Sequence, residues 1–178
     1  LTAVSPVRIS GTAVSSSRIR GLLEKGNVTD ANELLVFPYR VEGQVEQGQR
    51  RGKELGFPTA NLGSVYTLVP QDGVYAGVAT IASGARYGAA IHVGKNLTFG
   101  AANKTIEVHL LGFSGDLYGQ VLQVEFFQRI RATEKFEGVD ALTKQLHADV
   151  AQIESLSQLN LEKPQAQRVS LSSASFSG

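Results

Sequence analysis

A basic, glycine-rich segment at residues 48–61 is the part of the sequence with the clearest potential for chemistry. It reads GQRRGKELGFPTAN. Gly48 and Gly52 let the backbone approach a ligand closely, and three cations, among them Lys53, suit a chain of phosphates. The glycine spacing, and the glutamate that follows Lys53, differ from those of a Walker loop. The segment is therefore a candidate phosphate site, with a solvated basic hairpin loop as the alternative interpretation.

Two oxygen-bearing side chains close this segment. Pro58 restricts Phe57 to extended geometry, and in a chain that continues extended, Thr59 and Asn61 project to the same side. Hydroxyl and amide oxygens beside a basic loop suit a Mg²⁺ ion that bridges nucleotide phosphates, since Mg²⁺ takes few protein ligands. An ordinary turn would also explain the Pro-Thr-Ala-Asn run.

The second candidate for chemistry is Glu107, in the run TIEVHLL at residues 105–111. Strand alternation places Glu107 on the face opposite Ile106 and Val108. A carboxylate held between apolar neighbours suits a general base for a substrate hydroxyl. From periodicity alone, however, an ordinary solvent-facing glutamate is the favoured interpretation.

These candidates lie in a β-rich region, residues 39–156, which we expect to form one domain. Short glycine-bounded runs predict strands, and their connections are too short for crossover helices, so the sheet is expected to be antiparallel and closed into a barrel. The predicted strands are 41–45, 73–81, 87–93, 105–111 and 121–127.

Helices are expected on both sides of this region. Residues 1–38 form a separate helical segment, with one helix capped by the serines at 15–17, a second helix at 29–36, and a boundary near Pro38. Apolar residues at three- and four-residue spacing predict an amphipathic helix at 139–156. The serine-rich residues 157–178 are expected to be a flexible tail.

Composition excludes several classes of function. The chain has 178 residues and a formal net charge of +1, so nothing indicates a nucleic-acid partner. It has no cysteine, which excludes thiolate metal sites and cysteine nucleophiles. The longest uncharged apolar stretch, residues 73–85, is shorter than the roughly 18 residues of a membrane-spanning helix. The three histidines are scattered and predict no zinc site.

Several runs, in order, resemble the riboflavin kinase family, in particular the C-terminal kinase module of the prokaryotic bifunctional riboflavin kinase/FMN adenylyltransferase. The likeness covers about residues 39–155. The matching runs are GKELGFPTANL at 52–62, DGVYAG at 72–77, TIEVHLL at 105–111, DLYG at 116–119, and Arg131 with Phe136.

This resemblance implies a six-stranded Greek-key barrel with a C-terminal helix. It also implies transfer of the γ-phosphate of ATP to the 5′-hydroxyl of riboflavin, giving FMN and ADP. By position, Thr59 and Asn61 would hold Mg²⁺ and phosphates together with Gly48 and Gly52. Lys53 would sit in the phosphate loop, although bacterial members usually carry arginine there, whose bidentate fork lysine lacks.

The resemblance further assigns Glu107 as the catalytic base and Arg131 to the loop that covers flavin. A cytoplasmic enzyme is expected. Residues 15–20, SSSRIR, resemble a late motif of the adenylyltransferase domain, so we expect residues 1–38 to be a remnant of it and the FMN adenylyltransferase activity to be absent from this chain.

Two other functions fit parts of the same sequence. A non-catalytic flavin- or nucleotide-binding barrel would explain the same loop and pocket. A small oligonucleotide-binding barrel would use the cations at residues 50–53, although the net charge and the few aromatic residues speak against it. The sequence does not indicate an oligomeric state.

Overall fold

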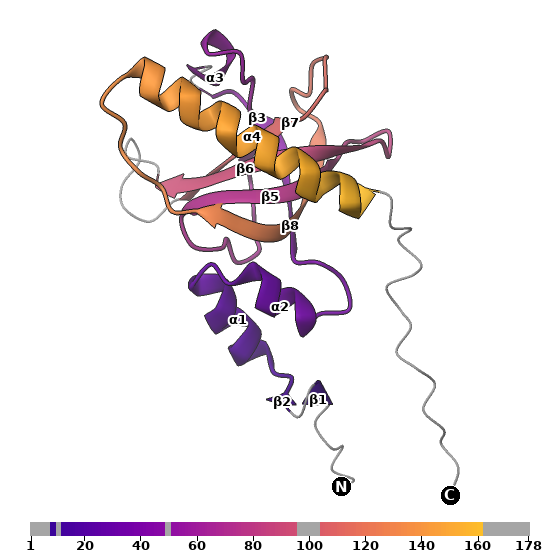
Figure 1. Cartoon of the computed structure of the whole chain (residues 1–178). Coiled ribbons are helices and arrows are strands. Elements are labelled where there is room, and N and C mark those ends of the chain that lie inside the picture. The colour runs from indigo at the N-terminus through magenta and orange to yellow at the C-terminus, as the bar shows by residue number, and fades with distance from the viewer. Residues whose placement is uncertain (1–7, 10–11, 49–50, 96–103, 162–178) are drawn as a thin grey trace, which may run out of the picture.

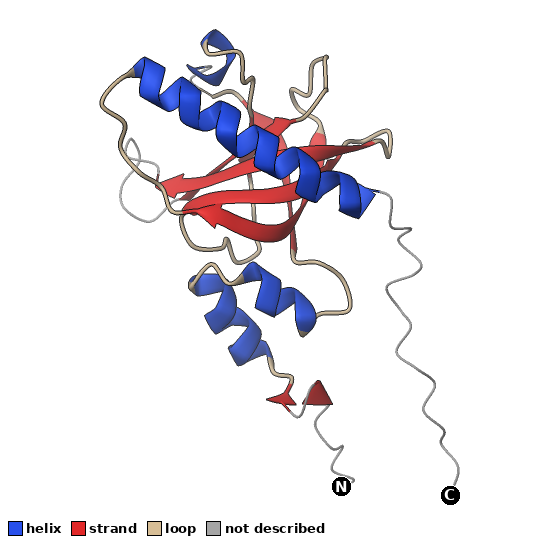
Figure 2. Ribbon diagram, viewed as in Figure 1, coloured by secondary structure: helices blue, strands red, loops and turns tan. Residues whose placement is uncertain are grey.

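The chain folds around a closed six-stranded antiparallel barrel (Figures 1 and 2). The computed structural model describes residues 8–9, 12–48, 51–95 and 104–161. Around the barrel the strand order is β3-β4-β7-β6-β5-β8, with β8 closing on β3. The barrel strands are β3 (Arg40–Glu46), β4 (Ala60–Gly63), β5 (Gly73–Thr80), β6 (Arg86–Lys95), β7 (Lys104–Leu110) and β8 (Val121–Arg131).

The topology confirms the Greek-key expectation. β5, β6 and β7 follow one another as paired neighbours, and β8 then returns to pair with β5. The five strands expected from the sequence are all present. The short strand β4 was not among them, because its four residues include an asparagine and a glycine, both of which are rare in strands.

Side chains that alternate along the strands fill the barrel. β3 and β7 bury every second residue, so their other residues face outward. β5 is different: seven of its eight residues are buried, because a helix covers its outer face. The inner core is built from β-branched and aromatic residues, among them Val41, Ile91, Val108, Val124 and Phe126.

The covering helix, α4 (Val139–Leu161), lies across β5 and β6 (Figure 1). Ile153 is fully buried against Val74 and Ala76 of β5. The helix passes the predicted end at residue 156 because Ser157 is buried and donates a hydrogen bond to the Gly77 carbonyl at 3.0 Å. The prediction of a tail from residue 157 is therefore wrong for residues 157–161, and residues 162–178 lie outside the described part.

Two N-terminal helices, α1 (Ser16–Glu24) and α2 (Val28–Glu33), lie at one end of the barrel, opposite the short helix α3 (Arg51–Glu54; Figure 1). The Ser15 hydroxyl caps α1 by accepting from the Arg18 amide, as predicted. α2 ends three residues earlier than expected, and its buried residues are Val28 and Ala31. A small hairpin, β1 (Arg8–Ile9) and β2 (Thr12–Ala13), precedes them.

The N-terminal helices share the core of the barrel. Leu23, Val28 and Ala31 belong to the same buried cluster as the barrel residues. Asn32 ties the two parts together, since its Nδ2 donates to the Phe126 carbonyl at 2.8 Å and its Oδ1 accepts from the Tyr39 amide at 2.6 Å. The domain boundary near Pro38 remains a prediction. In the structure, residues 16–33 pack against the barrel and share its buried core.

Tyr75, buried at this end of the barrel, makes the stability of the fold sensitive to alkaline pH. Burial raises its pKa to about 12, although the nearby Arg129 guanidinium acts in the opposite direction. The native state therefore holds this proton more tightly than the unfolded chain, where tyrosine titrates near 10. The stabilisation is complete below about pH 10, and about 2 to 3 kcal/mol is lost as the pH rises towards 12.

We expect the substitution Tyr75→Phe to remove this loss. Urea unfolding at pH 8, 10 and 11.5 measures it as the difference between the two proteins, which cancels the titration of other groups. The wild type should lose more free energy of unfolding than Tyr75→Phe between pH 10 and 11.5. Parallel pH curves for the two proteins would contradict the assignment.

Candidate active site

The pairing of β4 with β7 brings Asn61 and Glu107 side by side. They are direct cross-strand partners, flanked by the pairs Ala60↔Val108 and Leu62↔Ile106. The flanking residues are buried in the barrel, whereas Asn61 and Glu107 are half-buried on its outer face. Directly opposed residues of an antiparallel pair have Cβ atoms about 4.5–5.5 Å apart. The amide and the carboxylate can therefore act on one bound molecule.

A polar row extends from this pair in both directions across the sheet. Glu46 of β3 is the partner of Asn61, and His92 of β6 is the partner of Glu107. Both side chains point to the outer face, because opposed residues share a face. No local sequence pattern marks Glu46 or His92, because the row forms only through the register of four strands.

The two glycines of the basic segment lie directly against this site. A β-carbon on Gly48 would lie 2.0 Å from Asn61 Nδ2, so only glycine leaves room for the amide in this position. A β-carbon on Gly52 would lie 2.3 Å from the Phe57 carbonyl oxygen and 3.4 Å from Thr59 Oγ1. The structure thus brings Gly48 to Asn61 and Gly52 to Thr59.

Lys53 and Thr59 border the same region. Thr59 directly precedes β4 and is half-buried, and Lys53 is exposed on the one-turn helix α3 next to Gly52. Residues 49 and 50 of this segment lie outside the described part of the chain. Hydroxyl and amide oxygens, close backbone approach and a nearby cation form the set of groups expected for a phosphate-binding site.

Two of the three histidines, His109 and His147, contact the residues just before Thr59. The buried ring of Phe57 lies edge-on to His109 of β7, with centroids 5.6 Å apart, and to His147 of α4, at 4.9 Å. His109 Nδ1 is 2.8 Å from the Pro58 carbonyl oxygen. Their spacing in the sequence gives no sign of this cluster.

Arg131 lies at the end of β8, and its guanidinium is held by α4. Its Nε and Nη2 make a bidentate pair with Asp149, at 3.0 and 2.8 Å. Asp149 is buried and also accepts from Gln145. Arg131 further contacts Glu134 and lies over the ring of Phe136, 5.5 Å from its centroid. The structure therefore places Arg131 in a network that fastens the 132–138 loop to α4.

Removing the charge of Asp149 should destabilise the protein. Asp149→Asn leaves the largely buried guanidinium of Arg131 without its main partner, which costs about 3 to 5 kcal/mol in a fully buried pair. Arg131 keeps 18% side-chain exposure and the Glu134 contact, so we expect about 2 kcal/mol. Urea unfolding measures this loss against the exposed control Asp140→Asn, and an equal midpoint for the two variants would contradict it.

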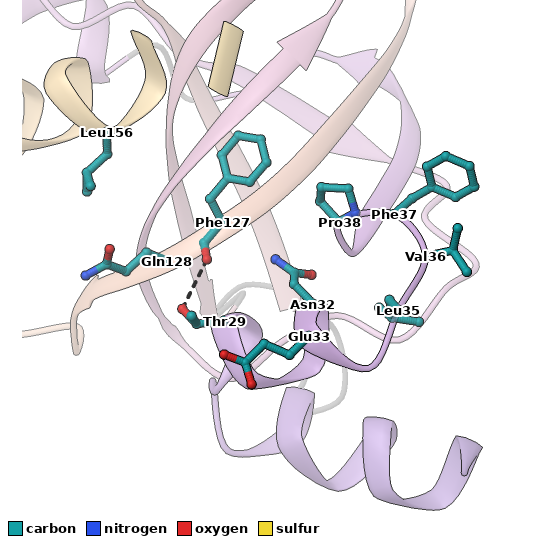
Figure 3. Close-up of a pocket in the computed structure, with 10 residues that line it drawn as sticks. All are labelled: Thr29, Asn32, Glu33, Leu35, Val36, Phe37, Pro38, Phe127, Gln128 and Leu156. Atoms are coloured by element: carbon teal, nitrogen blue, oxygen red, sulfur yellow. Dashed lines mark hydrogen bonds between the residues drawn. The ribbon is translucent and has the colours of Figure 1, made fainter. Parts of the chain in front are cut away.

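A cavity of about 510 Å³ lies away from this site, between α2, the segment that follows α2, β8 and α4 (Figure 3). Thr29 donates a hydrogen bond to the Phe127 carbonyl at its edge. None of the residues predicted from the sequence to act in the site lines this cavity. The candidate active site is instead the polar row of Glu46, Asn61, Glu107 and His92 on the outer face of the barrel.

The described residues hold neither a ready-made metal centre nor a membrane-spanning helix. No three His, Asp or Glu side chains gather there in a way that could hold a metal ion on their own. In the same residues, no helix combines the length and apolar character needed to cross a membrane.

Comparison with known proteins points to one family. Residues 35–157 match the flavokinase family model, described as riboflavin kinase. The bifunctional riboflavin kinase/FMN adenylyltransferase of Bacillus subtilis is 40% identical over 140 residues, which are 76% of this chain and 44% of that protein. The chain thus spans less than half the length of this curated relative.

Solved structures share the fold. The riboflavin kinase of Trypanosoma brucei superposes with a TM-score of 0.53 at 26% identity, covering 73% of this chain and 83% of that one. A Streptococcus pneumoniae structure described as a macrolide-efflux protein gives a TM-score of 0.78 at 38% identity, covering 85% of this chain and 50% of that one. That description belongs to that protein, and the family model and the curated relative both indicate a flavin kinase.

Proposed function

The chain belongs to the riboflavin kinase family, and from this premise we propose that its kinase reaction takes place on the outer face of β4 and β7. Riboflavin phosphorylation to FMN is the activity of this family. The observation that carries the location is the cross-strand pair of Asn61 and Glu107, with Gly48 directly against the amide. The proposal assigns the donor as the γ-phosphoryl group of ATP and the acceptor as the ribityl 5′-hydroxyl.

Thr59 and Asn61 hold the nucleotide phosphates together with a Mg²⁺ ion. The donor set fits this ion, because hydroxyl and amide oxygens are hard ligands and Mg²⁺ completes its shell with phosphate and water oxygens. When bound, the ion neutralises charge on the phosphate oxygens.

Backbone groups and one cation complete the phosphate side. Gly48 and Gly52 bring the backbone next to the Asn61 amide and the Thr59 hydroxyl, because a β-carbon at either position would collide with Asn61 or with the Phe57 carbonyl. Lys53 adds a positive charge from α3. These groups position ATP and stabilise the charge that develops during transfer.

Glu107 serves the acceptor. Its carboxylate takes the proton of the riboflavin 5′-hydroxyl while that oxygen forms its bond to the γ-phosphorus, and the bond between this phosphorus and the β,γ-bridging oxygen breaks to release ADP. The carboxylate lies one strand from the Asn61 amide, so base and phosphate site adjoin. We assign Arg131 to the flavin-binding part of the site. Its pairing with Asp149 connects the end of β8 to α4 and so helps to hold the 132–138 loop, which is proposed to cover the flavin.

The proposal covers the kinase reaction alone. We propose that these 178 residues do not convert FMN to FAD, because the family model covers residues 35–157 and the match to the bifunctional relative covers 44% of it. A cytoplasmic location is part of the proposal, since ATP is the co-substrate.

Chromatography of the flavins tests the function. The purified chain, incubated with riboflavin, ATP and Mg²⁺, should yield FMN and no FAD, and reactions without ATP or with EDTA should yield neither. Binding of riboflavin without any FMN would favour the non-catalytic barrel. Formation of FAD from FMN would refute the proposed limit to one activity.

A further inference from the structure

Phe57 is a buried residue that anchors the start of residues 57–61, which include Thr59 and Asn61. Its side chain is 8% exposed and lies between a ring from β7 and a ring from α4. Its backbone amide donates to the Gly52 carbonyl at 2.8 Å, which ties α3 to the same point. Three separate elements therefore meet at this residue.

His109 holds the next residue through a polar contact. Pro58 has no backbone N–H, so its carbonyl is its one backbone group for hydrogen bonding. Because a carbonyl only accepts, the 2.8 Å contact requires that His109 Nδ1 carry a proton. The imidazole thus has one nitrogen committed to Pro58 and an edge packed on Phe57.

His109 and His147 contact Phe57 and Pro58, the two residues directly before the oxygen donor Thr59. Thr59 follows Pro58 in the chain, and its Oγ1 lies beside Gly52, which Phe57 also binds. If the two histidine contacts are lost, Phe57 and Pro58 are free to shift, and Thr59 shifts with them. A displaced Thr59 hydroxyl would bind the nucleotide phosphates less well, so KM for MgATP should rise.

We propose that His109 and His147 are positioning residues that act through Phe57 and Pro58 to hold Thr59 and Asn61 in place for the nucleotide. This inference rests on the proposed function, in which Thr59 and Asn61 bind the phosphates. In this proposal, α4 helps to orient the phosphate site through the contact of His147 with Phe57, in addition to stabilising the fold. His147 lies two residues before Asp149, which binds Arg131.

Variants of His109 separate the two contacts. His109→Phe keeps a ring against Phe57 and removes the donor to Pro58, whereas His109→Asn keeps a donor at the Nδ1 position and removes the ring. We expect His109→Phe to raise KM for MgATP about three- to tenfold, the equivalent of one lost hydrogen bond. KM for riboflavin should stay near the wild-type value, and the urea midpoint should fall slightly because a hydrogen bond within the protein is lost. His109→Asn should recover part of the loss in MgATP affinity.

Variants of His147 test the ring contact independently. His147→Ala should raise KM for MgATP, and His147→Phe should restore it, because phenylalanine keeps an aromatic edge against Phe57. This pair keeps the test decisive if His109→Phe fails to fold. Binding of MgADP by calorimetry should follow the same order as KM, without dependence on turnover.

Thr59→Ala distinguishes a failure of this inference from a failure of the proposed function. Raised KM for MgATP in Thr59→Ala together with wild-type values in both His109→Phe and His147→Ala would overturn the positioning role alone. An unchanged KM in Thr59→Ala would overturn the phosphate-binding role of Thr59 itself. Equal increases in both KM values that follow the loss of stability would show that the histidines serve only the fold.

Discussion

Replacing Glu107 by glutamine should reduce kcat for FMN formation about 10²- to 10⁴-fold, the range expected for loss of a general base. Glutamine has the shape of glutamate but takes no proton, so KM for both substrates should change little. Glu107 is half-buried on the outer face of β7, with its apolar neighbours turned inward. The free energy of unfolding should therefore change by less than about 0.5 kcal/mol.

A matched control for this variant is Glu42→Gln. Glu42 also lies on the outer face of a barrel strand, β3, but its partner across the sheet is Gln123 of β8. It should retain wild-type kcat. If Glu107→Gln retained wild-type kcat in the same assay, Glu107 would have no part in proton transfer.

The second large effect is expected from Gly48→Ala. The added methyl group would lie 2.0 Å from Asn61 Nδ2, so the amide must turn away. Because this amide is the end of a flexible side chain, the fold can adjust while the metal and phosphate ligand is lost. We expect KM for MgATP to rise about 10- to 100-fold, the equivalent of a hydrogen bond to a charged group.

A double-mutant cycle makes this prediction specific. In the Asn61→Ala background the displaced amide is absent, so adding Gly48→Ala should have little further effect on KM for MgATP. Gly21→Ala is the control for the glycine change, since a β-carbon there has open space around it. Full additivity of the two substitutions would mean that Gly48 acts independently of Asn61.

The barrel itself could be predicted from local patterns. Alternating apolar residues mark β3 and β7, and glycine-bounded apolar runs mark β5, β6 and β8. The end of α4 could not be predicted, because Ser157 looks like part of a polar tail and is buried only by its contacts with Gly77 and Gly88. Tertiary packing decides this boundary.

The sequence suggests candidate residues for the site but not their geometry. Thr59 and Asn61 share a face by alternation, and Glu107 faces outward for the same reason. The pairing of Asn61 with Glu107 depends on the register of β4 on β7, which the whole barrel sets. Likewise, no local pattern connects Arg131 to Asp149 or Phe57 to His147, since these contacts form only when α4 packs on the barrel.

Paramagnetic broadening tests the central claim most directly. With ADP present, Mn²⁺ in place of Mg²⁺ broadens the NMR signals of residues near the bound metal–nucleotide complex. Our account predicts selective loss of the signals of Gly48, Gly52, Thr59 and Asn61, with weaker broadening at Glu107 and sharp signals for Thr29 and Asn32 at the cavity. Broadening centred on Thr29 and Asn32, with Thr59 and Asn61 unaffected, would contradict it.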